Sequence, residues 1–140
     1  MLGMRNYTKK YVAGCRAKID GDLSTYRALV AAARNQPANA KALAAFEVTF
    51  FNNMVLLLDH LFVHRLRTVE GKDGNPLNEV RILCDPMMNN NNIVWMDKTI
   101  KYDPSNSVLK YKVGDEIKLN EADFLLLYRA FFAEIENKFL

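Results

Sequence analysis

The sequence predicts an α+β fold dominated by helices: a bundle of about four helices, with a small antiparallel β-hairpin or sheet inserted before the C-terminal helix. Two patterns lead to this fold class. Apolar residues recur at every third or fourth position through several long segments, which is the period of a helix with one buried face. Between residues 93 and 119, apolar and polar residues instead alternate, as they do in half-buried strands.

The length and composition predict one domain that spans residues 1–140. The chain has 140 residues, of which 50% are hydrophobic and 25% are charged, as in ordinary globular proteins. Its two cysteines, Cys15 and Cys84, belong to no metal-binding or redox spacing. We therefore expect no disulfide framework, and a reducing, cytoplasmic location fits this cysteine usage.

The first helix is predicted from about Thr8 to Arg34, with Thr8 as its N-cap. Its buried stripe is predicted to consist of Val12, Cys15, Ile19, Leu23, Tyr26, Val30 and Ala33. Gly14 and Gly21 weaken the helix slightly, and they would let another helix approach closely.

A second, central helix is predicted from about Ala38 to Arg67, apolar around most of its perimeter. The third helix is predicted to begin after its N-cap Asn75, with Pro76 in the first turn, where a missing N–H costs nothing. Pro86 is expected to end or kink this helix near Asp85.

The alternating segments 99–102 and 109–113 are predicted to be strands, with Gly114 and Asp115 as the two-residue turn of a hairpin. The last helix is the best defined, because Asn120 and Asp123 have the spacing of a capping box. Its buried stripe, which indicates a docked C-terminus, is predicted to contain Phe124, Tyr128, Phe131, Ile135 and Phe139.

Charge is distributed unevenly along the chain. Residues 1–34 carry seven Lys or Arg and two Asp, whereas residues 113–140 carry three Lys or Arg and six Asp or Glu. These opposite ends would attract each other within one bundle or between two chains. The sequence shows no concentrated basic and aromatic face, so we expect no nucleic-acid partner. The apolar stretch 46–66 contains too many polar groups for a typical membrane span, so no membrane partner is expected either.

His60 and His64 are the most suggestive pair for chemistry. Residues four apart lie one turn apart on a helix, and two such histidines can bind a divalent metal. However, the chain has no other histidine, and Leu61 stands where the HExxH signature has its glutamate. We therefore interpret both histidines as polar residues on the solvent side of the central helix, and predict no metal and no cofactor.

Two functional hypotheses remain. The favoured one is a non-enzymatic helical protein that acts through protein–protein contacts, with a homodimer as the expected assembly. The alternative is a small-molecule binding protein or enzyme that holds an anionic ligand near the start of the third helix, where unpaired N–H groups attract anions. Its candidate site residues are His60, His64, Arg67, Asn75 and Arg81. The competing expectation for Arg67 is a salt bridge to Glu70 or Asp73.

Overall fold

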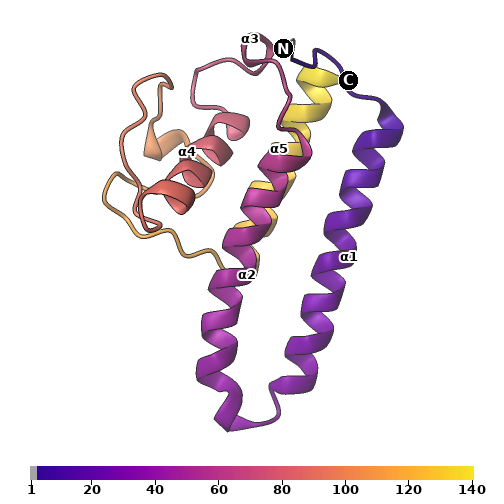
Figure 1. Cartoon of the computed structure of the whole chain (residues 1–140), viewed down its shortest axis with the longest axis vertical. Coiled ribbons are helices and arrows are strands. Elements are labelled where there is room, and N and C mark those ends of the chain that lie inside the picture. Colours follow the sequence, from indigo (N-terminus) through magenta and orange to yellow (C-terminus); the bar gives the residue numbers. More distant parts are fainter. Residues whose placement is uncertain (1–2) are drawn as a thin grey trace.

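Three long helices, one shorter helix and three short helical turns make up residues 3–140, the part of the chain that this computed structural model describes. In chain order they are α1 (Lys9–Ala33), η1 (Pro37–Asn39), α2 (Ala40–Leu61), α3 (Arg67–Glu70), α4 (Pro76–Asn89), η2 (Pro104–Asn106) and α5 (Glu121–Phe139). Together they form one compact helical domain (Figure 1).

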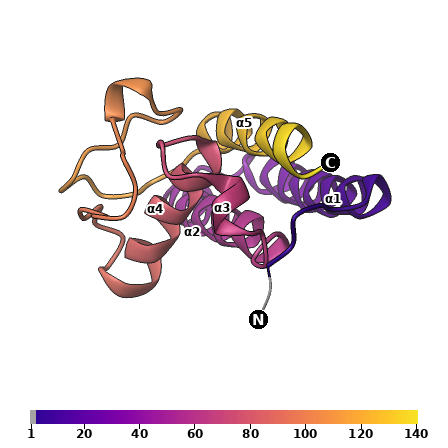
Figure 2. The ribbon, with the colours of Figure 1, turned by 90° about the horizontal axis from the view of Figure 1, so that it is seen from above.

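α2 and α5 lie at the centre of the molecule, with α1 on one side of them and α4 on the other (Figures 1 and 2). α4 packs closely on both central helices. Large side chains bridge the wider space between α1 and its neighbours. The ring of Tyr26 stacks on Phe50 with the centroids 4.8 Å apart, and the guanidinium of Arg16 lies 4.5 Å from the centre of the Phe132 ring.

Phenylalanine supplies much of the core. Of the eight phenylalanines in the chain, six have no exposed surface: Phe51, Phe62, Phe124, Phe131, Phe132 and Phe139. Burying one such side chain contributes about 1.5–3 kcal/mol. These residues come from α2, its C-cap and α5, so the core lies between the two central helices and the elements that flank them.

α1 confirms the predicted first helix. The hydroxyl of Thr8 accepts a hydrogen bond from the backbone N–H of Tyr11 at 3.0 Å, as an N-cap should. The predicted stripe is buried from Val12 to Val30.

Some of the opposite charges at the two ends of the chain meet inside the molecule. Arg16 on α1 pairs with Glu136 on α5, and Arg27 pairs with Glu121 at 2.7 Å. These ion pairs are exposed, so each contributes at most about 1 kcal/mol, and their order along the two helices shows that α1 runs antiparallel to α5.

The second helix ends six residues earlier than predicted, at Leu61 instead of Arg67. The chain turns because the side chain of Arg65 is drawn into the interior. None of that side chain is exposed, and its Nη1 donates to the carbonyl of Phe62, the C-cap of α2, at 3.1 Å. His64 and Arg67 therefore do not continue the helical face of α2.

α4 runs to Asn89, four residues beyond the predicted end at Asp85. Pro86 lies inside the helix. Pro86 cannot donate a hydrogen bond to the preceding turn, but the helix continues past it, because its carbonyl accepts the N–H of Asn90 at 2.9 Å. The start of α4 is as predicted, with Asn75 as the N-cap.

The predicted β-hairpin is wrong: residues 3–140 contain no β-strand. The segment 93–119 is a long loop that lies against the helices. Its buried side chains include Ile100, Ile117 and Leu119. The backbone is not that of a strand, because Lys110 in the predicted strand 109–113 has a φ of 61° and a 3₁₀ turn spans Pro104–Asn106.

Side chains from α4 and α2 form hydrogen bonds with the loop backbone, as a partner strand would in a sheet. Glu79 on α4 accepts the backbone N–H groups of Val108 and Leu109 at 2.8 and 2.9 Å. Asn52 on α2 donates to the carbonyl of Ile117 at 2.9 Å. Because the buried backbone groups of the loop are satisfied in this way, no strand pairing is needed.

Gly114 has the positive φ that a turn requires, at 95°, but the turn differs from the predicted one. The N–H of Asp115 donates to the carbonyl of Lys112 at 3.0 Å, so Gly114 is the third residue of a four-residue turn. Within the described chain, a single isolated antiparallel bridge, between Ile93 and Glu116, joins its flanks.

α5 confirms the predicted last helix. Asn120 and Asp123 form the capping box, and the whole predicted stripe is buried. The C-terminus is docked, because Phe139 is fully buried and its carbonyl accepts the N–H of Tyr7 at 2.6 Å. The two ends of the chain therefore lie at the same end of the bundle (Figure 1).

At the opposite end, the end of α1, η1 and the start of α2 form a narrow helical hairpin, and we call its residues 27–46 the arm (Figure 1). One helical segment, Pro37–Leu61, which includes part of the arm, is long and apolar enough to cross a membrane by length and composition alone. The core helices of soluble proteins can meet the same test, but only 28% of the most apolar 18 residues of this segment are buried.

Candidate functional site

The sequence-predicted site residues lie in three separate places. His60 and His64 are exposed and line a cavity of about 540 Å³ beside the N-terminal segment. Arg67 and Arg81 line another cleft, of about 380 Å³, beside α4. Asn75 lines neither of them. The structure thus does not bring the histidines, the arginines and the start of the third helix together in one pocket.

The backbone N–H groups in the first turn of α4 already have hydrogen-bond acceptors within the chain. The Oδ1 atom of Asn75 accepts the N–H groups of Leu77 and Asn78 at 2.9 and 3.2 Å, and its Nδ2 donates to the carbonyl of Glu70 at 2.8 Å. Leu77, Asn78 and Glu79 are buried. The N–H groups that would attract an anion are therefore engaged or shielded.

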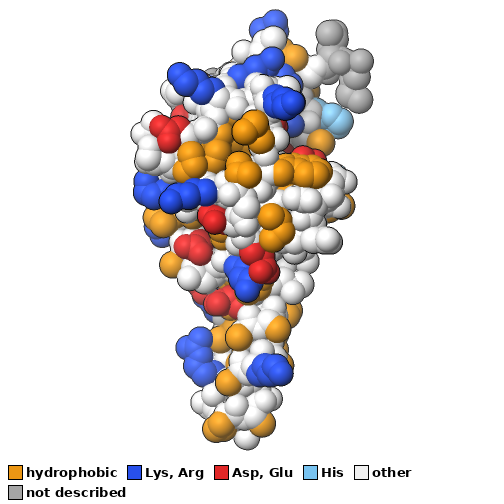
Figure 3. Space-filling model, turned by 90° about the vertical axis from the view of Figure 1, so that its left-hand side faces the viewer, with side chains coloured by type: hydrophobic (Ala, Val, Ile, Leu, Met, Phe, Trp, Pro, Cys, Tyr) orange, Lys and Arg blue, Asp and Glu red, His pale blue; other side chains and the backbone are white. Residues whose placement is uncertain are grey.

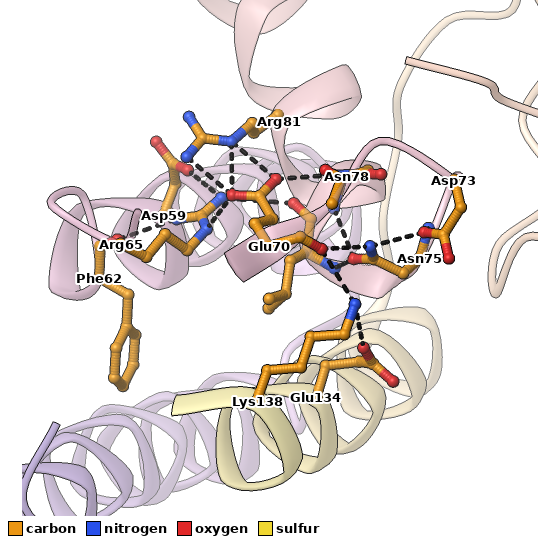
Figure 4. A network of polar contacts seen from close by, with 12 residues as sticks. Asp59, Phe62, Arg65, Glu70, Asp73, Asn75, Asn78, Arg81, Glu134 and Lys138 are labelled. Carbon is orange, nitrogen blue, oxygen red and sulfur yellow. Dashed lines mark hydrogen bonds and ion pairs between the residues drawn. The ribbon is translucent and has the colours of Figure 1, made fainter. Parts of the chain in front are cut away.

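A buried ionic network holds α2, α3 and α4 together (Figure 4). At its centre is Glu70, whose side chain has no exposed surface and accepts from Arg65 Nε at 2.8 Å, Arg81 Nε at 2.9 Å and Asn78 Nδ2 at 2.7 Å. Arg65 also binds Asp59 at 3.0 Å. The two arginines and the two carboxylates balance each other in charge.

The network keeps Glu70 ionised. Burial alone would raise the pKa of Glu70, but the hydrogen bond from Arg81, the charges of Arg65 and Arg81 and the amide of Asn78 outweigh it, so the pKa lies below its ordinary value. Lys138 on α5 adds a hydrogen bond of 2.9 Å to the Glu70 carbonyl. Because these groups satisfy one another, we interpret the network as a structural anchor.

The cleft with Arg67 and Arg81 is not a simple anion site. Within the described chain, Arg67 forms neither of the predicted salt bridges, to Glu70 or Asp73. Three carboxylates line the same cleft: Asp59, Asp85 and Asp97. Two guanidinium groups against three carboxylates give the lining a net charge of −1, which disfavours a small anion.

A longer apolar depression, which we call the α1–α2 groove, joins two cavities. The first, of about 540 Å³, is lined by Met4, Asn6, Tyr7, Thr8, Tyr11, His60, Leu61, Val63 and His64. The second, of about 480 Å³, is lined by Thr8, Lys10, Tyr11, Gly14, Cys15, Lys18 and Leu61. Because three residues line both, the cavities adjoin at Tyr11, whose hydroxyl donates to the carbonyl of Leu61.

The described residues indicate neither a metal site nor a reactive thiol. No group of three or more His, Cys, Asp or Glu in residues 3–140 is placed to hold a metal ion. Cys15 and Cys84 are both buried and unpaired, and burial raises the pKa of each thiol, which disfavours the reactive thiolate.

Sequence reasoning missed Arg65, Glu70 and Tyr11. The apolar periodicity places Arg65 on the central helix, and spacing alone indicates Glu70 only as a salt-bridge partner of Arg67. Tyr11 lies just outside the predicted buried stripe of α1, yet it forms the boundary between the two cavities. The sequence signal for this contact between α1 and α2 is a large aromatic residue, Tyr11, at the edge of the predicted buried stripe.

Models of known protein families give no match to this chain, and neither do curated proteins or solved structures. The function is therefore argued from the surfaces of this chain alone.

Proposed function

We propose that the protein is a non-catalytic helical module that acts through protein–protein contacts, and that its partner is a second copy of itself. The observation that carries the proposal is a stripe of small residues, which we call the outer face of α1. It consists of Gly14, Ala17, Gly21, Ser24, Ala28 and Ala31, all of them exposed.

The outer face has the geometry of a helix-packing seam. Its residues alternate in steps of three and four, the spacing of the contact positions in a coiled coil, and they lie opposite the buried stripe of α1. A Cβ atom added to Gly14 or Gly21 would meet nothing within 4 Å. Each glycine costs roughly 1 kcal/mol relative to alanine in a helix. Close packing of a partner helix against α1 would account for these two glycines.

The arm extends this surface. Nine of its twenty residues are alanine, and its three charged residues are Arg27, Arg34 and Lys41. Leu29 and Phe46 are 49% and 38% exposed. Figure 3 shows the arm as the narrow lower end of the molecule, with hydrophobic and basic side chains on it.

The available area indicates a weak dimer. α1 has 25 residues and is therefore about 37 Å long, so a contact one helix diameter wide covers roughly 400 Å² on each copy. The arm adds to this area. Stable complexes bury about 800 Å² per partner, so we expect a dissociation constant in the micromolar range.

Sedimentation velocity from about 1 to about 200 µM tests the proposal, since this range spans micromolar association. The wild type should rise from 16.0 kDa towards twice that mass. A double variant, Ala17→Glu with Ala28→Glu, should stay monomeric, because it puts charges into the seam. The matched control is Ala122→Glu with Ala133→Glu, at two exposed positions of α5.

The control variant should associate like the wild type. A wild type that remains at 16.0 kDa over the whole range, or two double variants that behave alike, would refute the outer face as an interface.

A further inference from the structure

We infer that the α1–α2 groove binds an anionic amphiphile, a small molecule with an apolar body and one carboxylate or similar anionic head. The site is separate from the centre of the proposed dimer surface, although both include Gly14. Its cavities of about 540 and 480 Å³ lie within the range of roughly 300–1,000 Å³ that small-molecule sites occupy.

The walls of the groove are apolar and uncovered. Met4, Tyr11 and Val63 are 44%, 43% and 45% exposed, and Tyr7 and Leu61 line the groove between them. An apolar chain placed here would remove this surface from water, at a gain of about 25 cal/mol per Å².

The form of the groove favours a thin molecule over a partner helix. The hydroxyl of Tyr11 donates to the carbonyl of Leu61, so this side chain bridges α1 and α2 between the two cavities. A helix is about 10–12 Å wide with its side chains and would have to displace the bridge. A methylene chain can instead follow the surface past the ring.

The basic side chains around the groove favour an anionic ligand. Four basic side chains line it: Lys10, Lys18, His60 and His64. No Asp or Glu of residues 3–140 is among its lining residues. Lys18 already binds Asp22 at 3.0 Å, so Lys10 is the expected contact for the anionic head.

Gly14 offers a way to block the groove without harming the fold. A side chain at position 14 meets no neighbour at its Cβ and would grow into the second cavity. Gly21 is equally open on the same helix but lines neither cavity. Gly14→Phe and Gly21→Phe are therefore a matched pair, one that blocks the site and one that does not.

Calorimetric titration with decanoate tests the site, and decyltrimethylammonium serves as the probe of opposite charge. Wild type and Gly21→Phe should bind decanoate equally, whereas Gly14→Phe should bind at least about tenfold more weakly. Lys10→Gln should weaken binding about fivefold, and Lys41→Gln on the arm should leave it unchanged. Circular dichroism confirms that each variant is folded.

The proposal is overturned if Gly14→Phe binds decanoate as tightly as Gly21→Phe, or if the cationic probe binds as well as decanoate. Self-association of the same variants is measured separately from ligand binding. Both glycines lie on the outer face, so the two Phe variants should impair self-association alike and differ only in ligand binding.

Discussion

Replacing Glu70 by glutamine tests how much the buried network contributes to stability. Glutamine has nearly the same shape as glutamate, but it removes the negative charge and presents an NH₂ group where a carboxylate oxygen accepted hydrogen bonds. Three donors converge on this carboxylate: Arg65 Nε, Arg81 Nε and Asn78 Nδ2, at 2.8, 2.9 and 2.7 Å. At least one of them must then face another donor.

The expected loss follows from the burial of Arg65, whose side chain has no exposed surface. Breaking a buried ion pair on one side costs about 3–5 kcal/mol, because the remaining charge stays in the interior. Arg65 keeps Asp59 and the carbonyls of Phe62 and Leu77 as partners, so we expect about 3 kcal/mol. With an unfolding entropy of about 2.1 cal/mol/K per residue, this lowers Tm by about 10 °C.

Urea unfolding and calorimetric melting at neutral pH measure this loss. The matched control is Glu134→Gln, which removes the partner of Lys138 in a partly exposed pair at 3.1 Å and should cost less than about 1 kcal/mol. If Glu70→Gln were no more destabilising than Glu134→Gln, the network would not be the anchor of the α2–α3–α4 corner.

The same variant should change the response to pH. The pKa of Glu70 is lower in the folded protein than its ordinary value of 4.5, so its stabilising effect is complete above pH 4.5 and is lost as the pH falls through the folded value. The difference in unfolding free energy between wild type and Glu70→Gln should therefore narrow in acid. Glu79 acts in the opposite direction, because burial raises its pKa, so the comparison with the variant is needed to isolate Glu70.

Four further changes test the helices and one turn, each by thermal unfolding of the variant beside the wild type. Gly14→Ala and Gly21→Ala should each raise stability by about 0.5–1 kcal/mol, because both positions are helical and open. Gly74→Ala should lower it by 2 kcal/mol or more, of the order that strained backbone costs, since φ is 87° and a Cβ would lie 2.4 Å from the Lys101 carbonyl oxygen. Asn120→Ala should cost about 1 kcal/mol through the lost cap of α5; an unchanged Tm would contradict that role.

The helices with strong local signals could be predicted from the sequence. The caps Thr8 and Asn120 and the apolar stripes that follow them are short-range features, and α1 and α5 form as predicted. The end of α2 could not be predicted in this way. The burial of Arg65 is decided by Glu70 and Asp59, and apolar periodicity carries no information about such an ion pair.

The loop that replaces the predicted sheet also depends on contacts between residues far apart in the sequence. A loop with some buried side chains can show the same alternation as a strand, although its backbone turns and its hydrogen-bond partners lie elsewhere in the chain. Here the partners are Glu79, 29 residues before Val108, and Asn52, 65 residues before Ile117. Such long-range contacts leave no local pattern.

The sequence predicts the exposure of two candidate site residues, but the five candidates do not share one pocket. The exposure of His60 and His64 agrees with their interpretation as solvent-side residues, and both line the groove. Their grouping with Arg67 assumed that α2 continues through residue 67, and it fails because the helix ends at Leu61. The role of the groove as a binding site stays a prediction.

Both proposed surfaces follow from the way α1 is packed. Its large side chains, among them Arg16 and Tyr26, face the other helices and hold α1 at a distance, since helix separation is set by the side chains at the contact. The space on the α2 side becomes the groove, and Gly14, at the edge that the groove shares with the outer face, adds no bulk to it. From Gly14 to Ala31 the outer face of α1 carries only small residues, so it offers a second helix a close approach. The arrangement of large and small residues along α1 thus accounts for both proposed surfaces, the α1–α2 groove for a thin ligand and the outer face for a partner helix.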